Sequence, residues 1–257
     1  MIALENVSKS YPNSTGPVVK DLCLNVAPES LLVLLGESGC GKTTTLKMIN
    51  RLVETSSGRI TLAGEDIHAL DPIDLRRRIG YAFQGIGLFP HMTVARNIAV
   101  VPELLEWPRK KIDERVDELL DMMGLPSNEF KSRFPSELSG GQQQRVGVAR
   151  ALAARSRLLL MDEPFGALDP ITRDELQTEL KTLQRTLGLT IVLVTHDVTE
   201  ALLLADRIAV MKEGMLLAHD TPERLLRDPP HEYVKSLMQM PKRQAAQLAR
   251  ISGTSSE

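Results

Sequence analysis

The sequence has few cysteines and aromatic residues and no excess of either charge. Its 257 residues include two cysteines, one Trp, three Tyr and five Phe. Two cysteines cannot form the disulfide framework of a small secreted scaffold, so a reducing compartment is the simplest interpretation. Lys and Arg number 31 against 33 Asp and Glu, a net charge of −2. Because proteins that bind nucleic-acid phosphates usually carry a basic excess, we expect no nucleic acid among the partners.

Long apolar runs are also missing. Runs such as residues 31–35 and 158–161 have the length of strands and fall far short of the roughly 18 residues that suggest a membrane span. The first five residues, MIALE, show no basic region followed by an apolar stretch, so we expect no secretion signal. With 42% hydrophobic and 25% charged residues, the composition is that of a soluble globular protein.

Short apolar runs alternate with segments of helical periodicity. The predicted strands are 31–35, 59–63, 79–83, 158–161 and 190–195, with a hairpin of 208–211 and 215–218. The predicted helices are 42–51, 74–78, 111–123, 142–154 and 174–187. This alternation favours an α/β fold with a parallel sheet, in which ligands bind at the carboxyl ends of the strands. The mostly helical stretch of about 74–155 predicts an inserted lobe, and the tail from Lys242 is expected to fray.

The clearest motif is GESGCGKT at residues 36–43, which fits G-x-x-x-x-G-K-[ST] between a predicted strand and a predicted helix. Glycines allow successive loop amides to face phosphate oxygens, and the following helix adds its positive N-terminal dipole. Lys42 then reaches the β- and γ-phosphates, and the Thr43 hydroxyl ligates Mg²⁺. A glycine-rich turn without a ligand is the alternative, which the strand–loop–helix context disfavours.

Two carboxylates follow the apolar run 158–161. Asp162 ends the predicted strand and is suited to hold Mg²⁺ through water, whereas Glu163, one residue further, is free to take a proton from an attacking water. The alternative is that both acids merely end a strand at the surface. The phosphate-binding loop elsewhere in the chain favours the metal and base roles.

A second potential anion site is LSGGQ at residues 138–142. Ser139 is a good N-cap, and the two glycines free the backbone amides at the start of a helix to face an anion. A plain helix cap without a ligand is an alternative. If both loops bind phosphate, either they fold over one nucleotide within the chain, or two chains pair so that each completes the other's site.

These motifs, in this order and spacing, resemble the ATP-binding cassette family of transporter ATPases over almost the whole chain, to about residue 235. In that family two copies sandwich two ATP molecules head to tail, so the resemblance implies a homodimer. It also implies a P-loop NTPase core with a parallel sheet, an N-terminal antiparallel β subdomain and an inserted α-helical subdomain within residues 1–235. A short tail, 236–257, follows.

The resemblance carries further roles over to single residues. Tyr11 matches the aromatic that stacks on adenine, Gln84 the glutamine that senses the γ-phosphate side and contacts the transmembrane partner, and His196 the histidine that orients water and γ-phosphate. Asp169 matches the loop that communicates across the dimer. The predicted catalytic residues are Glu163, His196, Gln84 and Lys42, and the predicted Mg²⁺ residues are Thr43, Gln84 and Asp162. The predicted ATP-binding residues are Tyr11, Gly36, Glu37, Ser38, Gly39, Cys40, Gly41, Lys42, Thr43, Thr44, Ser139, Gly140, Gly141, Gln142 and Asp169.

Cys40 lies within the loop next to a helix N-terminus. Thiol pKa values tend to fall at such positions, so the sequence predicts a reactive thiol that is alkylated quickly and protected by MgATP. A small residue at a permissive loop position is the alternative.

Segments 46–52, 87–93 and 163–170 resemble the ATPases of bacterial importers for glycine betaine, choline and related osmoprotectants. This finer resemblance implies a permease and a solute-binding protein as partners and a peripheral location on the cytoplasmic face of the inner membrane. Some members carry paired regulatory domains after the ATPase; because the sequence stops at Glu257, we do not expect ionic-strength sensing through such a module. An importer or exporter of another substrate is the alternative, whereas a P-loop kinase would lack LSGGQ.

Overall fold

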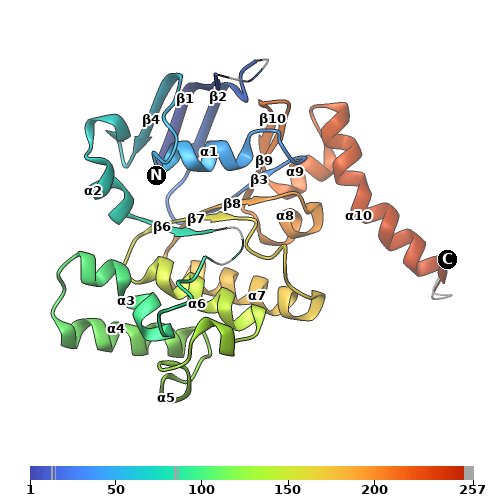
Figure 1. Ribbon diagram of the computed structural model, residues 1–257. Helices are drawn as coiled ribbons and strands as arrows, with labels where there is room; N and C mark the ends of the chain where they lie inside the picture. The colour runs from blue at the N-terminus through green and yellow to red at the C-terminus, as the bar shows by residue number, and fades with distance from the viewer. Residues whose placement is uncertain (13, 15, 84, 86, 252–257) are drawn as a thin grey trace.

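The computed structural model describes residues 1–12, 14, 16–83, 85 and 87–251 and contains two β-sheets flanked by helices (Figure 1). The smaller sheet is antiparallel, with strand order β2-β1-β4-β5, and the larger sheet has the order β10-β9-β3-β8-β7-β6. Gln84 lies outside the described residues.

The elements follow the order that the α/β interpretation requires. The small sheet consists of β1 (Ile2–Lys9), β2 (Val19–Val26), β4 (Ser57–Leu62) and β5 (Glu65–Asp66). The large sheet consists of β3 (Leu31–Leu35), β6 (Ile79–Ala82), β7 (Leu158–Asp162), β8 (Thr190–Thr195), β9 (Arg207–Lys212) and β10 (Met215–Asp220). The helices are α1 (Lys42–Ile49), α2 (Pro72–Arg77), α3 (Val94–Leu104), α4 (Arg109–Met122), α5 (Ser127–Phe130), α6 (Gly140–Leu152), α7 (Pro170–Leu187), α8 (Val198–Leu204), α9 (Pro222–Arg227) and α10 (Glu232–Ile251), with 3₁₀ turns at Ile67–Ala69 and Pro135–Glu137.

The large sheet is parallel except for its last strand. β9, β3, β8, β7 and β6 pair in parallel, and β10 pairs antiparallel with β9 through the predicted hairpin. Every residue of β3, β7 and β8 is buried. Strands that are buried on both faces read as continuous apolar runs, which is why these three could be predicted from sequence.

Alternate residues of these strands face two different cores. Leu32, Leu34, Leu158 and Leu160 pack with α1 and the small sheet. Their neighbours, such as Val33 and Leu159, pack with the helical segment that contains α3, α4, α6 and α7. In Figure 1, α1 accordingly lies on one side of the large sheet, and α6 and α7 lie on the other.

The helical segment is narrower than the predicted lobe. β6 falls within the stretch 74–155 but pairs with β7 as part of the large sheet, so the run of packed helices begins at α3 and ends with α6. Gly80 of β6 approaches α6 closely, because a Cβ there would stand 2.4 Å from the Ala151 carbonyl oxygen.

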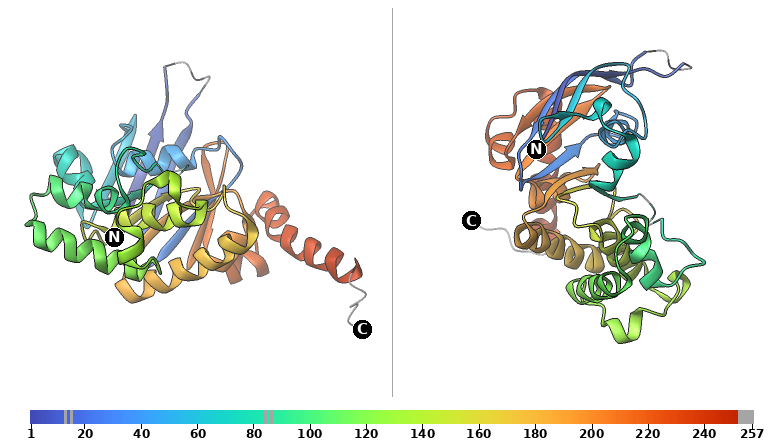
Figure 2. Two further views of the ribbon diagram at one scale, coloured as in Figure 1. Left: turned by 60° about the horizontal axis from the view of Figure 1, so that its bottom comes forward. Right: turned by 90° about the vertical axis from the view of Figure 1, so that its left-hand side faces the viewer.

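Helix α10 occupies the segment expected to fray from Lys242. It continues to Ile251 and projects from the body of the molecule (Figure 2). The sequence QAAQLAR near its end is made of strong helix formers, which explains the extension. Among the described residues, no helix combines the length and apolar character needed to cross a membrane.

Candidate nucleotide-binding site

The glycine-rich loop connects β3 to α1 and is wedged against two other segments. A Cβ at Gly36 would stand 2.2 Å from the carbonyl oxygen of Met211 at the end of β9. A Cβ at Gly41 would stand 2.7 Å from the carbonyl oxygen of Val18, the residue before β2. Gly214, in the β9–β10 turn, donates its amide to the Cys40 carbonyl oxygen at 3.2 Å. The loop conformation therefore depends on glycine where neighbouring backbone leaves no room for a side chain.

Lys42 turns its ammonium group back into this loop. Its Nζ donates to the Gly36 and Glu37 carbonyl oxygens at 2.6 and 2.8 Å, and the residue is only 4% exposed. The charge is thus concentrated within a ring of backbone at the N-terminus of α1. Such an arrangement of cation, amides and helix dipole suits a phosphate group.

Thr43 and Asp162 bring α1 and β7 together. The Thr43 hydroxyl donates to Asp162 Oδ1 at 2.8 Å. Burial raises the pKa of Asp162, although the Thr43 hydrogen bond opposes that effect. Within the described part of the chain, no group of three or more His, Cys, Asp and Glu forms a metal cage. One hydroxyl and one carboxylate fit Mg²⁺, which usually binds proteins through one or two such oxygens and takes its other ligands from phosphates and water.

Glu163 and His196 follow neighbouring parallel strands. The Glu163 amide donates to the Val194 carbonyl oxygen at 3.0 Å, and Glu163 has a positive φ of 46°. Its Oε1 lies 3.4 Å from Nδ1 of His196. The structure therefore brings a carboxylate and an imidazole together at the ends of β7 and β8.

Tyr11 lies in the β1–β2 connection and is 38% exposed. The Lys9 ammonium stands 5.0 Å from the centre of its ring. The far end of that connection, Val18, is the segment that abuts Gly41. A flat exposed ring in this connection is compatible with base stacking.

Ser139 and Asp169 both cap helices. The Ser139 hydroxyl accepts the Gln142 amide at 3.3 Å, while the Gln142 side chain accepts the Ser139 amide at 3.0 Å, which forms a capping box at α6. Asp169 Oδ1 accepts the Thr172 amide at the start of α7. A Cβ at Gly141 would stand 2.4 Å from Thr172 Cγ2, so the starts of the two helices pack closely.

The two glycine-rich elements lie on different faces of the large sheet. The phosphate-binding loop leads into α1, which packs on one face, and the LSGGQ segment leads into α6, which packs on the other (Figure 1). One chain therefore presents two separate helix starts with exposed polar groups.

The expectation that the pKa of Cys40 falls is wrong. Its side chain is 6% exposed, and burial raises its pKa, with the neighbouring Lys42 only partly offsetting that effect. The helix N-terminus favours a thiolate, but removal of the sulfur from water outweighs it here.

The sequence did not reveal a set of polar contacts between α7 and the start of α8, the helix that follows His196. Arg173 and Gln177 of α7 reach toward Asp197 and Glu200, which stand at and within the start of α8. The only sequence signal is that these acids follow His196 by one and four residues.

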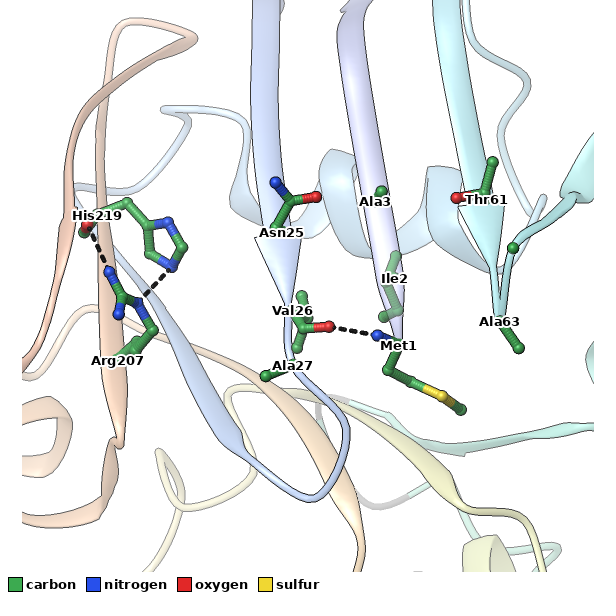
Figure 3. Close-up of a pocket in the computed structure, with 11 residues that line it drawn as sticks. Met1, Ile2, Ala3, Asn25, Val26, Ala27, Thr61, Ala63, Arg207 and His219 are labelled. Atoms are coloured by element: carbon green, nitrogen blue, oxygen red, sulfur yellow. Dashed lines mark hydrogen bonds between the residues drawn. The ribbon is translucent and has the colours of Figure 1, made fainter.

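A separate pocket of about 740 Å³ lies between the small sheet and the β9–β10 hairpin. Figure 3 shows Arg207 and His219 on one side and Asn25 and Thr61 on the strands opposite. Arg207 donates to both the ring and the carbonyl oxygen of His219, at 3.3 Å each. None of the predicted nucleotide residues lines this pocket.

The fold and the loop define a P-loop nucleotide-binding protein. Residues 19–166 match the family model described as "ABC transporter". The chain is 56% identical over 238 residues, 93% of its length, to the glycine betaine/carnitine/choline transport ATP-binding protein OpuCA of Bacillus subtilis. It is 55% identical over 235 residues, 91% of its length, to the glycine betaine uptake system ATP-binding protein YehX of Escherichia coli.

Solved structures agree. The ATP-binding cassette MJ0796, a dimer bound to ADP and Pi, is 33% identical, with a TM-score of 0.77 over 86% of this chain and 99% of that one. CbiO1 of Clostridium perfringens has a TM-score of 0.82 at 28% identity, over 96% and 98%. The chain belongs to the ABC transporter family of ATP-binding proteins. It spans 62% of the length of OpuCA and 75% of that of YehX.

Proposed function

We propose that the chain is the ATP-hydrolysing subunit of an importer for quaternary-amine osmoprotectants. ATP hydrolysis is supported by two pairs of side chains that meet at the carboxyl ends of β7 and β8. Thr43 bonds to Asp162, and Glu163 lies beside His196. Together they supply oxygen ligands for a cation and a carboxylate beside an imidazole, next to a phosphate-binding loop.

Each residue has a distinct task in this proposal. The loop amides and Lys42 bind the β- and γ-phosphates and neutralise charge as the terminal phosphoryl group leaves. Thr43 and Asp162 hold Mg²⁺, which supplies further charge neutralisation when bound. Glu163 accepts a proton from the attacking water, and His196, beside that carboxylate, orients the water and the γ-phosphate. Tyr11 stacks on the adenine ring.

Two chains complete each other's sites. Because the LSGGQ segment and the phosphate-binding loop lie on different faces of the large sheet, a two-fold pair of chains can place each opposite the other and form two equivalent sites. Ser139 and the Gly140 and Gly141 amides then close on the partner's nucleotide, with Asp169 beside them. ATP favours the closed pair, and hydrolysis removes that preference.

The permease is proposed to dock in a pocket of about 300 Å³ between β6, α3 and α6, whose lining includes Phe83 and Phe89, 46% and 41% exposed. Arg150, which also lines it, donates to the Gly87 carbonyl oxygen at 2.7 Å and so holds one wall. Exposed aromatic rings in a concave surface suit a helix with apolar side chains. In this proposal the chain works at the cytoplasmic face of the membrane, beside a permease that receives solute from a binding protein.

The substrate class rests on relatives. OpuCA of Bacillus subtilis, at 56% identity, is a glycine betaine/carnitine/choline transport protein, and YehX, at 55%, belongs to a glycine betaine uptake system. The spermidine/putrescine import ATP-binding protein PotA of Acidothermus cellulolyticus is 46% identical. We therefore favour quaternary amines and take polyamines, which share a cationic nitrogen, as the second candidate.

Two measurements test the two parts. The purified chain should release phosphate from MgATP, and Glu163→Gln should stop turnover while the chain still pairs in the presence of ATP. In source cells that lack the chain, wild type but not Glu163→Gln should restore uptake of labelled glycine betaine or choline in high-osmolarity medium. Restored uptake of spermidine alone would overturn the quaternary-amine assignment, and normal turnover by Glu163→Gln would overturn the role of Glu163.

A further inference from the structure

Glu200 is a charged residue with an almost fully buried side chain that the proposed reaction does not use. It lies on α8, the helix that follows His196, and is 5% exposed. Burying a carboxyl group is costly unless hydrogen bonds compensate for the lost water, and burial raises the pKa of Glu200. The residues that contact Glu200 therefore indicate the role of its side chain.

The first partner belongs to α7. Gln177 Nε2 donates to Glu200 Oε1 at 2.9 Å, and Gln177 is itself 8% exposed. Helix α7 begins with the Asp169 cap. One turn earlier than Gln177, Arg173 donates to the Leu168 carbonyl oxygen at 3.2 Å and lies 3.8 Å from Asp197. Helix α7 is thus joined at two levels to the segment that carries His196.

The second partner is Thr195, the last residue of β8. Its hydroxyl accepts the Asp197 amide at 3.0 Å, and the Glu200 amide donates to Asp197 Oδ1 at 3.1 Å, so Glu200 and Thr195 are joined through Asp197. The Thr195 hydroxyl also opposes the rise in the pKa of the Glu200 carboxyl group. Thr195 precedes His196 in the chain and Asp197 follows it, so these bonds fix the backbone on both sides of the histidine.

His196 depends on this support because it has little packing of its own. Its side chain is 58% exposed, and Glu163 Oε1 lies 3.4 Å from its ring nitrogen. A ring with so much freedom keeps its place only if the backbone beneath it is fixed. A displacement of about 1 Å in a reacting group can lower a rate roughly a hundredfold.

We propose that Glu200 is a positioning residue, which holds His196 against Glu163 through Thr195 and ties that pair to α7 and its Asp169 loop through Gln177. This inference rests on the proposed ATPase function and adds to it a buried link between the loop expected to face the partner chain and the histidine. Glu200 touches neither the nucleotide nor the water. Its loss should slow turnover without weakening nucleotide binding.

The test uses matched variants of the full chain. Thr195→Val removes the central hydroxyl, whereas Thr195→Ser keeps it. Gln177→Leu removes the donor to Glu200. The control Gln184→Leu lies two turns further along α7, removes an equally buried glutamine that donates to the Glu29 and Leu189 carbonyl oxygens, and leaves the His196 segment untouched.

Steady-state ATP hydrolysis should show a fall in kcat of tenfold or more for Thr195→Val and Gln177→Leu, with KM for ATP within twofold of wild type. Thr195→Ser should restore kcat, and Gln184→Leu should leave kcat unchanged even where it lowers Tm. Equal kcat losses in Gln177→Leu and Gln184→Leu, or a wild-type kcat in folded Thr195→Val, would overturn the positioning role.

A second readout does not require activity. The imidazole signal of His196, assigned by NMR with a His196→Gln reference, should shift in Thr195→Val and Gln177→Leu and stay in place in Thr195→Ser and Gln184→Leu. An unmoved signal in the first two variants contradicts the inference. An inactive wild type with the expected shifts contradicts the ATPase proposal and supports the structural link.

Discussion

Thr43 on α1 and Asp162 on β7 are joined by a hydrogen bond of 2.8 Å between hydroxyl and carboxylate, across 119 residues of sequence. Asp162 is 4% exposed, and burial raises its pKa. The Thr43 hydrogen bond offsets this burial only in part, so we infer that the carboxylate has a use that outweighs its cost in stability. In the proposed function that use is the cation.

The Asp162→Asn variant should separate the stability cost of the buried carboxylate from its proposed role in cation binding. Because the folded-state pKa of Asp162 lies above the ordinary value, its stabilising contribution is complete below about pH 3.8 and is lost as pH rises through the raised pKa. At pH 7 the unfolded chain therefore gains more from ionising this group than the folded chain does, which lowers stability. An amide that can still accept the Thr43 hydroxyl should add on the order of 1 kcal/mol at pH 7.

Thermal unfolding with EDTA present, at pH 7 and pH 4, measures this effect. We expect Asp162→Asn to have a higher Tm than wild type at pH 7, a smaller advantage at pH 4 and no MgATP turnover. The exposed Asp121→Asn is the matched control and should change stability by less than about 0.5 kcal/mol at either pH. A lower Tm for Asp162→Asn at pH 7 would show that the carboxylate stabilises the fold.

Mixed dimers test whether two chains share each site. Lys42→Ala removes the phosphate-binding charge, and Ser139→Arg blocks the LSGGQ segment, so each variant alone should be inactive. A pair with one chain of each kind keeps one site with both elements intact. If chains exchange freely and sites act independently, an equal mixture should regain about a quarter of wild-type activity. Phosphate release, with pairing followed by light scattering, measures it. Mixed pairs without activity would argue for sites within one chain.

The parts of the molecule that could be predicted from sequence are those fixed by local chemistry. Strands β3, β7 and β8 are buried on both faces and read as unbroken apolar runs. The phosphate-binding loop is contiguous, and its glycines and lysine have few alternative uses. The predicted helix 42–51 and the β9–β10 hairpin are confirmed for the same reason, with helix ends shifted by about two residues.

The parts that sequence did not reveal depend on tertiary contacts. The Gln177–Glu200 hydrogen bond spans 23 residues and joins α7 to α8. Nothing in the sequence pattern of either helix indicates that these two polar side chains meet. The pKa of Cys40 is raised where the sequence predicted a lowered value. The cause is burial, which arises from the packing of β9 and β2 around the loop. Helix α10 was missed in part because polar composition near a chain end suggested fraying, although Ala, Gln, Leu and Arg all favour helix.

Gly36→Ala should show that the loop has no room for a methyl group. The new Cβ would stand 2.2 Å from the Met211 carbonyl oxygen and 2.8 Å from Cys40 Sγ. Relief requires movement of backbone, so we expect destabilisation of about 1–3 kcal/mol and at least tenfold weaker ATP binding. Gly16→Ala is the control, because nothing lies within 4 Å of its added Cβ. Urea unfolding and nucleotide titration measure both effects. Equal stability of the two variants would contradict the close packing of Gly36.

The two cysteines should differ in reactivity, with Cys23 reacting first. Cys23 is exposed on β2, whereas Cys40 is buried in the loop and has a raised pKa. Only the thiolate is nucleophilic, so both accessibility and charge slow Cys40. With iodoacetamide at pH 7.5, peptide mass spectrometry should find Cys23 modified at least tenfold faster than Cys40. Both should react at similar rates in urea, and the Cys23→Ser variant should take up almost no label while folded. Faster labelling of Cys40 than of Cys23 in the native chain would show that the loop opens enough to expose its thiol.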